Sequence, residues 1–73
     1  MAQLTVREYD ALEAAIRERR RVVVRRRRQD VVVIPERLVI HNRREAIEAR
    51  HPTTGERVVL WIDEAESVEV VPG

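Results

Sequence analysis

Few side chains in this chain of 73 residues could act as catalysts or metal ligands. It contains no cysteine and no lysine, so thiol and amine nucleophiles are missing, and Ser67 is its single serine. His41 and His51 lie ten positions apart, which is not the spacing by which a helix presents two imidazoles to one metal ion. We therefore expect no enzyme, no catalytic residue, no metal, no cofactor and no small-molecule substrate.

Charged side chains are the remaining functional candidates. Fourteen basic and thirteen acidic residues give a net charge of +1, so overall charge favours neither nucleic acid nor a membrane surface. The arginines are nevertheless concentrated between residues 17 and 28, and guanidinium groups bind phosphates through paired hydrogen bonds. The candidates for contacts with nucleic acid are Arg20, Arg21, Arg25 and Arg27. The alternative is that the same arginines form a solvated rim of ion pairs.

The first element that must position these groups is a helix over about residues 6–19. Thr5 and Glu8 have the spacing of a capping box, in which each side chain binds the backbone N–H of the other residue. Tyr9, Leu12 and Ile16 follow at the spacing of one apolar helix face. The pattern predicts a helix that buries this face and leaves its carboxylates and arginines exposed.

The rest of the chain is typical of short strands. It is rich in valine, and turn-forming residues, such as the segment 52–55 with its glycine, separate its apolar runs. Pro35 lies inside one of these runs and lacks a backbone N–H, so that strand should be bent or bulged there. We expect five strands, at about residues 21–28, 30–40, 44–51, 56–62 and 67–71.

These elements predict a single domain over residues 1–73, mostly β with one N-terminal α-helix. A bent second strand lets a small antiparallel sheet curl over itself, which favours a five-stranded Sm-like or SH3-like barrel capped by the helix. The apolar runs are far too short to span a membrane, and the segment Met1–Leu4 shows no charged region before an apolar stretch. We therefore expect no signal peptide, no membrane contact and a cytoplasmic location.

The fourth expected strand contains a second candidate surface. Val59 and Trp61 alternate with the apolar residues that fill the core, so they should point to the opposite side of the strand. Tryptophan is enriched at the centres of protein interfaces. The pair is therefore a candidate interface, for a partner or for a second copy of the chain, and the alternative is packing within the domain.

Two segments carry motifs of a known family. The helix segment Tyr9–Ala15 matches the pattern Tyr-Asp-x-Leu-Glu-x-Ala, and Leu38 matches a leucine after a bent second strand. A second pattern, Gly-Glu…Leu-x-Leu-Asp…Ser, is matched by Gly55, Glu56, Leu60, Ile62, Asp63 and Ser67. In these positions, from about residue 9 to residue 70, the chain resembles the Rof (YaeO) family, small bacterial inhibitors of the transcription-termination factor Rho.

The resemblance implies an Sm-like barrel with an N-terminal helix that binds Rho on its primary RNA-binding surface and blocks termination. Carried over by position, the carboxylates that would contact this protein partner are Glu8, Asp10 and Glu13. The chain departs from the family in charge, because Rof proteins are strongly acidic. This difference leaves two alternatives, an Sm-like RNA-binding module that uses the cluster Arg19–Arg28, and a structural or oligomer-forming domain.

Overall fold

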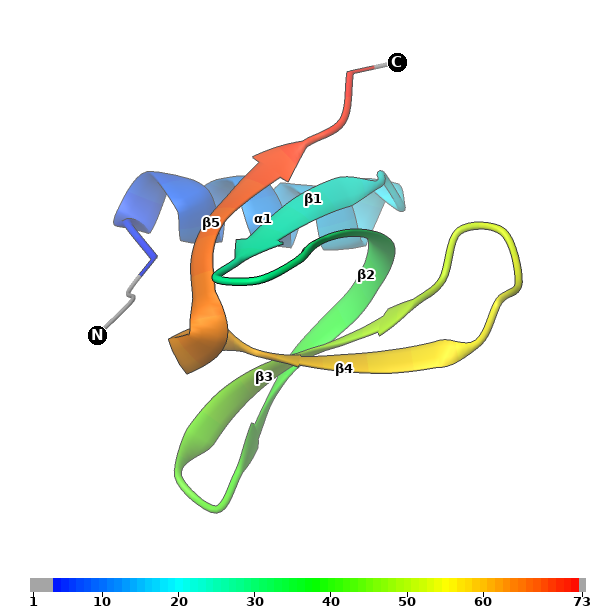
Figure 1. The fold of residues 1–73 in the computed structure, drawn as a ribbon. Coiled ribbons are helices and arrows are strands. Elements are labelled where there is room, and N and C mark those ends of the chain that lie inside the picture. Colours follow the sequence, from blue (N-terminus) through cyan, green and yellow to red (C-terminus); the bar gives the residue numbers. More distant parts are fainter. Residues whose placement is uncertain (1–3, 73) are drawn as a thin grey trace.

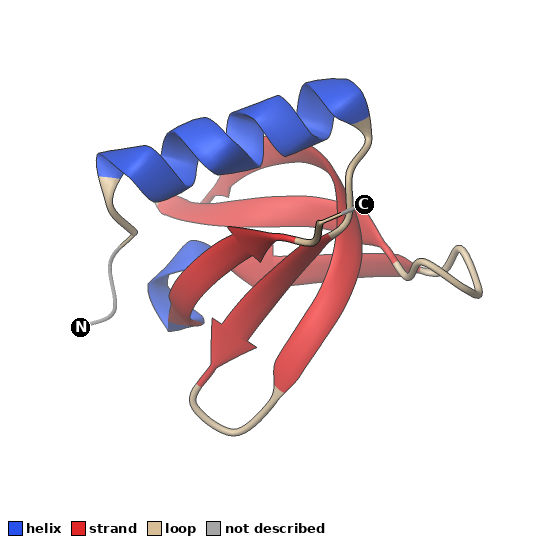
Figure 2. Ribbon diagram, turned by 90° about the horizontal axis from the view of Figure 1, so that it is seen from above, coloured by secondary structure: helices blue, strands red, loops and turns tan. Residues whose placement is uncertain are grey.

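One helix precedes five antiparallel strands, as the sequence predicts. In the computed structural model, which describes residues 4–72, α1 (Val6–Glu18) lies across a curled sheet, and a short 3-10 helix, η1 (Ile62–Glu64), interrupts the last part of the chain (Figure 1 and Figure 2). The hydrogen-bonded order of the strands is β4-β3-β2-β1-β5. Their bounds are β1 (Val22–Arg26), β2 (Asp30–His41), β3 (Arg44–Arg50), β4 (Arg57–Trp61) and β5 (Ala65–Val70).

Local hydrogen bonds set both ends of α1. The Thr5 hydroxyl accepts a hydrogen bond from the Glu8 N–H at 3.1 Å, and the Glu8 carboxylate accepts one from the Thr5 N–H at 2.9 Å, which confirms the capping box. Arg19 adopts a left-handed conformation with φ of 56° and ends the helix one residue earlier than the expected bound. Within residues 4–72, no helix combines the length and the apolar content needed to cross a bilayer.

The long strand β2 produces the curl of the sheet. Its first part pairs with β1, in the register Val22↔Val33, and its second part pairs with β3, in the register Leu38↔Ile47. The pairing shifts between Pro35 and Arg37, so the predicted bend lies at the proline. Among the described residues no register joins β4 to β5; the chain passes between these two edge strands through η1 (Figure 1). The barrel is therefore open at this edge.

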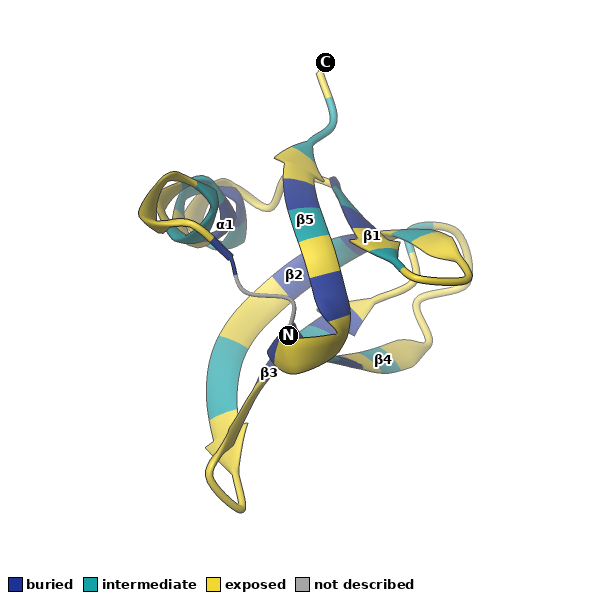
Figure 3. Cartoon of the chain, turned by 60° about the vertical axis from the view of Figure 1, so that its left-hand side comes forward, coloured by how far each residue is buried: buried dark blue, intermediate teal, exposed yellow. Residues whose placement is uncertain are grey.

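The core lies between α1 and the inner face of the curled sheet. Leu12 and Ala15 are buried on the helix, and Tyr9 and Ile16 pack beside them, which confirms the expected apolar face. The sheet contributes valines and other small apolar residues, and Figure 3 shows buried positions recurring along β5 between exposed ones. The buried members from the strands and η1 are Val22, Val24, Val33, Ile47, Ala49, Leu60, Ile62, Ala65 and Val68.

Two strand ends differ from the expected bounds by two residues, and the others agree to within one. The first expected strand, 21–28, ends at Arg26, because the ladder with β2 ends at Arg25↔Asp30 and the remaining residues form the turn. The last strand begins at Ala65, where the sequence predicts residue 67. Ala65 is completely buried, so the chain must already have re-entered the sheet at this position, and the acidic turn shortens to η1.

Candidate functional site

The predicted acidic face of α1 contains one carboxylate with a structural task. One Glu8 oxygen binds the Thr5 N–H, and the other accepts a hydrogen bond of 3.0 Å from the Val68 N–H on the edge strand β5. These backbone hydrogen bonds hold the pKa of Glu8 below its ordinary value, because they favour the charged form. Glu8 therefore ties the start of the helix to the sheet, and both of its oxygens are occupied.

Asp10 and Glu13, the other two carboxylates of this face, are exposed. They lie three residues apart on α1 and so on neighbouring turns of one helix face. Neither forms an ion pair with any residue in the range 4–72. Arg7 and Arg17 are exposed on the same helix, so the surface of α1 is mixed in charge.

A hydrogen bond orients this helix on the sheet, and the sequence reasoning missed it. The Tyr9 hydroxyl donates to the Glu45 carboxylate on β3 over 2.7 Å. This bond to the neutral phenol, together with partial burial and the nearby negative charge, raises the pKa of Tyr9 to about 12. Tyr9 and Glu45 are separated by 36 positions, so no local pattern could have indicated the contact.

The four arginines predicted to contact nucleic acid fall into two groups. Arg20 pairs with Glu18 at 3.1 Å, and Arg25 pairs with Asp30 at 3.0 Å. Arg21 and Arg27 are exposed and have no ion pair among residues 4–72. The sequence placed all four in one cluster, whereas the structure leaves only the second group free for a partner.

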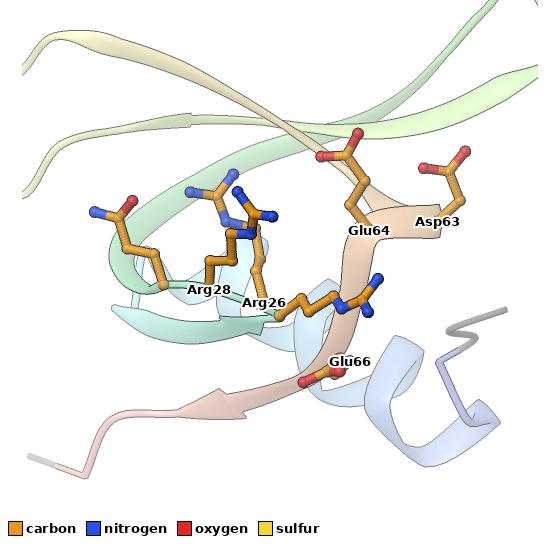
Figure 4. A pocket seen from close by; sticks show the side chains of 7 residues that line it. Arg26, Arg28, Asp63, Glu64 and Glu66 are labelled. Atoms are coloured by element: carbon orange, nitrogen blue, oxygen red, sulfur yellow. The ribbon is translucent and has the colours of Figure 1, made fainter.

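Arg27 belongs to an open hollow with a volume of about 720 Å³. Figure 4 shows that arginines from the end of β1 and the following turn face carboxylates from η1 and β5. The lining residues are Arg26, Arg27, Arg28, Gln29, Asp63, Glu64 and Glu66. The hollow therefore has a cationic wall and an anionic wall, and the sequence reasoning did not anticipate that these segments would meet.

Arg44 connects the anionic wall to Trp61. Its guanidinium donates two hydrogen bonds to Asp63, at 2.8 and 2.9 Å. The Cζ atom of the same guanidinium lies 4.2 Å from the centroid of the Trp61 ring. The paired guanidinium holds the pKa of Asp63 below its ordinary value. Trp61 also meets the ring of His41 edge to face, with the centroids 6.4 Å apart. Much of the indole is thus covered by groups of its own domain.

Val59, the other residue of the predicted interface, remains 49% exposed on β4. The register pairs Glu48 with Val59 and Ala46 with Trp61, so these four side chains share the outer face of the sheet. Ala46 is completely buried although it lies outside the core cluster, and its cross-strand neighbours are Val39 on β2 and Trp61 on β4. The two residues of the predicted interface therefore differ in exposure. Trp61 is packed against its neighbours, and Val59 is open to solvent.

The two histidines lie at opposite ends of β3 and do not form a common site. His41 is paired with Arg44 at one end, while His51 follows Arg50 at the other. The Nδ1 atom of His51 accepts hydrogen bonds from the Thr53 and Thr54 N–H groups at 3.1 and 3.2 Å, so this side chain organises a turn. Within residues 4–72, no three histidine or carboxylate side chains converge in a way that could hold a metal ion.

No protein-family model matches this chain, and no curated protein matches it. The resemblance to the Rof family therefore stays a prediction from the motifs in residues 9–70, beside the observed arrangement of one helix and five strands. In that arrangement the helix motif Tyr9–Ala15 lies on α1, and the motif that begins at Gly55 runs through β4, η1 and β5.

Proposed function

We propose that this protein is a non-enzymatic binding module that, like Rof proteins, binds transcription-termination factor Rho and blocks its RNA-binding surface. The observation that carries the proposal is the pair of exposed carboxylates, Asp10 and Glu13, which form no ion pair within residues 4–72 and lie on a helix that also bears the Tyr9–Ala15 motif. Carboxylates can bind the arginine and lysine side chains that otherwise hold RNA phosphates. A helix with these groups would compete with RNA for the same cations.

The fixed orientation of α1 supports this role. Its first turn is held by the Glu8 contact to Val68, and its second turn by the hydrogen bond from Tyr9 to Glu45. Because the helix is already ordered on the sheet, binding would require little additional loss of conformational entropy. The structure thus presents the two carboxylates on a rigid support.

The arginines of the β1–β2 turn do not oppose the proposal. They lie on a different element from Asp10 and Glu13, and they face the carboxylates of η1 and β5 across the hollow. These carboxylates reduce the positive potential near the turn. A basic partner that approaches Asp10 and Glu13 therefore does not meet the arginines of the turn, although Arg7 and Arg17 lie on the same helix.

The test is a binding titration of the protein against the cognate Rho hexamer, together with displacement of an RNA oligonucleotide from Rho. We expect the unchanged protein to bind and to displace the RNA. The double variant Asp10→Asn/Glu13→Gln should bind at least about tenfold more weakly, since two charge-assisted pairs are lost.

A matched control removes two exposed carboxylates near the turn between β3 and β4, in the double variant Glu36→Gln/Glu56→Gln. Its affinity should remain within about twofold of the unchanged protein, because exposed charges distant from an interface contribute little. Absence of binding by the unchanged protein would refute the proposal. An equal loss in both double variants would also refute it, because the effect would then reflect net charge alone.

A further inference from the structure

The hollow between the β1–β2 turn and η1 has hydrogen-bonding groups that no other contact uses. Its volume of about 720 Å³ lies within the range of sites for small ligands, roughly 300–1,000 Å³. None of Arg26, Arg27 and Arg28 forms an ion pair within residues 4–72. Three guanidinium groups on one wall are therefore free to bind an anion.

Arg26 shows this unused capacity most directly. Its Nε atom is shielded from solvent and has no hydrogen-bond partner among the residues that the structure describes. A shielded guanidinium N–H without an acceptor is unfavourable, so the Arg26 side chain has hydrogen-bonding capacity that the contacts within residues 4–72 leave unsatisfied. Arg26 lies at a bulge in the ladder between β1 and β5. Arg25 pairs with Ser67, but Arg26 pairs with Ala65. The residue skipped by the register is Glu66, which lines the hollow.

The opposite wall offers hydrogen-bond acceptors. Asp63 is bound by Arg44 through two hydrogen bonds, and Glu64 approaches the same guanidinium less closely, at 3.4 Å. Glu66 is exposed and has no ion pair among the described residues. A simple anion would satisfy the arginines but would be repelled by these carboxylates. The complementary ligand therefore carries an anionic group at one end and N–H donors at the other.

We propose that this hollow binds a guanosine phosphate, with the phosphate on Arg26–Arg28 and the base edge on Glu66. Guanine presents a ring N–H beside an exocyclic amine, so one carboxylate can accept both hydrogen bonds. Uracil presents a single N–H between two carbonyl oxygens and would be repelled. The ligand is either a free nucleotide or one unit of single-stranded RNA. The inference goes beyond the proposed function and uses neither Asp10 nor Glu13.

The test measures binding of GMP, UMP, guanosine and inorganic phosphate to the unchanged protein by calorimetry. We expect GMP to bind at least about tenfold more tightly than each of the other three, because only GMP satisfies both walls. Equal affinity for GMP and inorganic phosphate, equal affinity for GMP and UMP, or no binding of GMP at millimolar concentration would overturn the proposal.

Two sets of variants locate the ligand. The double variant Arg27→Gln/Arg28→Gln, on exposed turn residues, should weaken GMP binding at least about tenfold, while Arg7→Gln/Arg17→Gln on α1 changes net charge equally and should have less than about a twofold effect. Equal losses would overturn the proposal. Glu66→Gln should reduce the preference for GMP over UMP without weakening the binding of inorganic phosphate; an unchanged preference would overturn the role of the base edge.

The two sources of the ligand are distinguished by competition with a guanine-containing single-stranded RNA oligonucleotide. If GMP displaces the RNA, a unit of the RNA occupies the hollow. If the protein binds GMP but not the RNA, the ligand is the free nucleotide. If the RNA binds, resists GMP and binds equally well to Arg27→Gln/Arg28→Gln, other arginines hold the RNA and the ligand of the hollow is the free nucleotide.

Discussion

At the residue scale, single carboxylates and one phenol connect distant parts of the chain. Glu8 links the N-terminus of α1 to β5, and Glu45 on β3 accepts the hydrogen bond of Tyr9. Both contacts depend on protonation, because a carboxylate must be charged to accept these bonds fully and a phenol must be neutral to donate. The free energy of unfolding should therefore depend on pH both in the acidic and in the alkaline range.

At low pH, the contribution of Glu8 should be lost. Its pKa is lowered in the folded state from an ordinary value of 4.5, so its contribution is present above that value and disappears as the pH falls through the lower, folded pKa. The variant Glu8→Gln should be less stable near neutral pH and should lose less stability on acidification. Urea unfolding at several pH values measures this, with the exposed residue in Glu56→Gln as a control. Identical acid sensitivity of Glu8→Gln and the unchanged protein would contradict the assignment.

At high pH, the single tyrosine can be titrated directly. The pKa of Tyr9 is raised to about 12 from 10.0, so its contribution is complete below pH 10 and is lost as the pH rises toward 12. Ultraviolet absorbance of the tyrosinate should show this late titration. In Glu45→Gln the pKa of Tyr9 should move back toward its ordinary value, since the Glu45 carboxylate is the main cause of the raised pKa. An unshifted titration in that variant would show that burial, and not Glu45, controls the phenol.

At the element scale, short polar contacts determine how one element leads to the next. The turn between β3 and β4 is organised by His51, whose Nδ1 accepts two backbone N–H groups, and by Arg50, which donates to the Gly55 carbonyl at 3.0 Å. Gly55 has φ of 75°, a conformation that a residue with a side chain rarely adopts. The turn therefore depends on side-chain acceptors as well as on glycine.

Replacing His51 by asparagine or alanine separates these contributions. His51→Ala removes both acceptor contacts and should reduce the free energy of unfolding by about 1 kcal/mol. His51→Asn places an amide oxygen near the same N–H groups and should retain most of this stability, because asparagine makes equivalent contacts in turns. Thermal or urea unfolding of the two variants measures the difference. Equal losses would show that the imidazole contributes through packing and not as an acceptor.

At the scale of the whole molecule, α1 and the sheet share one core. Leu12 and Ile47 are completely buried, on the helix and on β3, and both belong to the same core cluster. A domain of this size is stabilised by about 4–11 kcal/mol in total. The helix and the sheet should therefore unfold together.

Leu12→Ala tests this cooperativity. The substitution should lower the free energy of unfolding by about 2–5 kcal/mol, because it leaves a cavity between α1 and the sheet. Val6→Ala, at a helix position that is 78% exposed, should change it by less than about 0.5 kcal/mol. Circular dichroism of the helix and fluorescence of Trp61 on β4 should follow a single transition in both variants. Separate transitions would contradict the shared core.

The sequence alone determined the local features of this fold. The capping box, the apolar face of α1, the alternation of the strands and the bend at Pro35 all depend on residues within one segment, so their spacing is sufficient to predict them. The exposed carboxylates Asp10 and Glu13 follow from the same helical period. The ends of β1 and β5 were less predictable, because they depend on where each strand meets its neighbour.

Only the tertiary structure decided which charged groups meet. Glu8 lies 60 positions from Val68, and the arginines of the β1–β2 turn lie more than thirty positions from the carboxylates that face them. The same is true of Trp61, which became covered because Arg44 lies across the sheet from it. Such contacts follow from strand order, register and one bulge, and these are set by the packing of the entire core. A local pattern of charges carries no information about that packing.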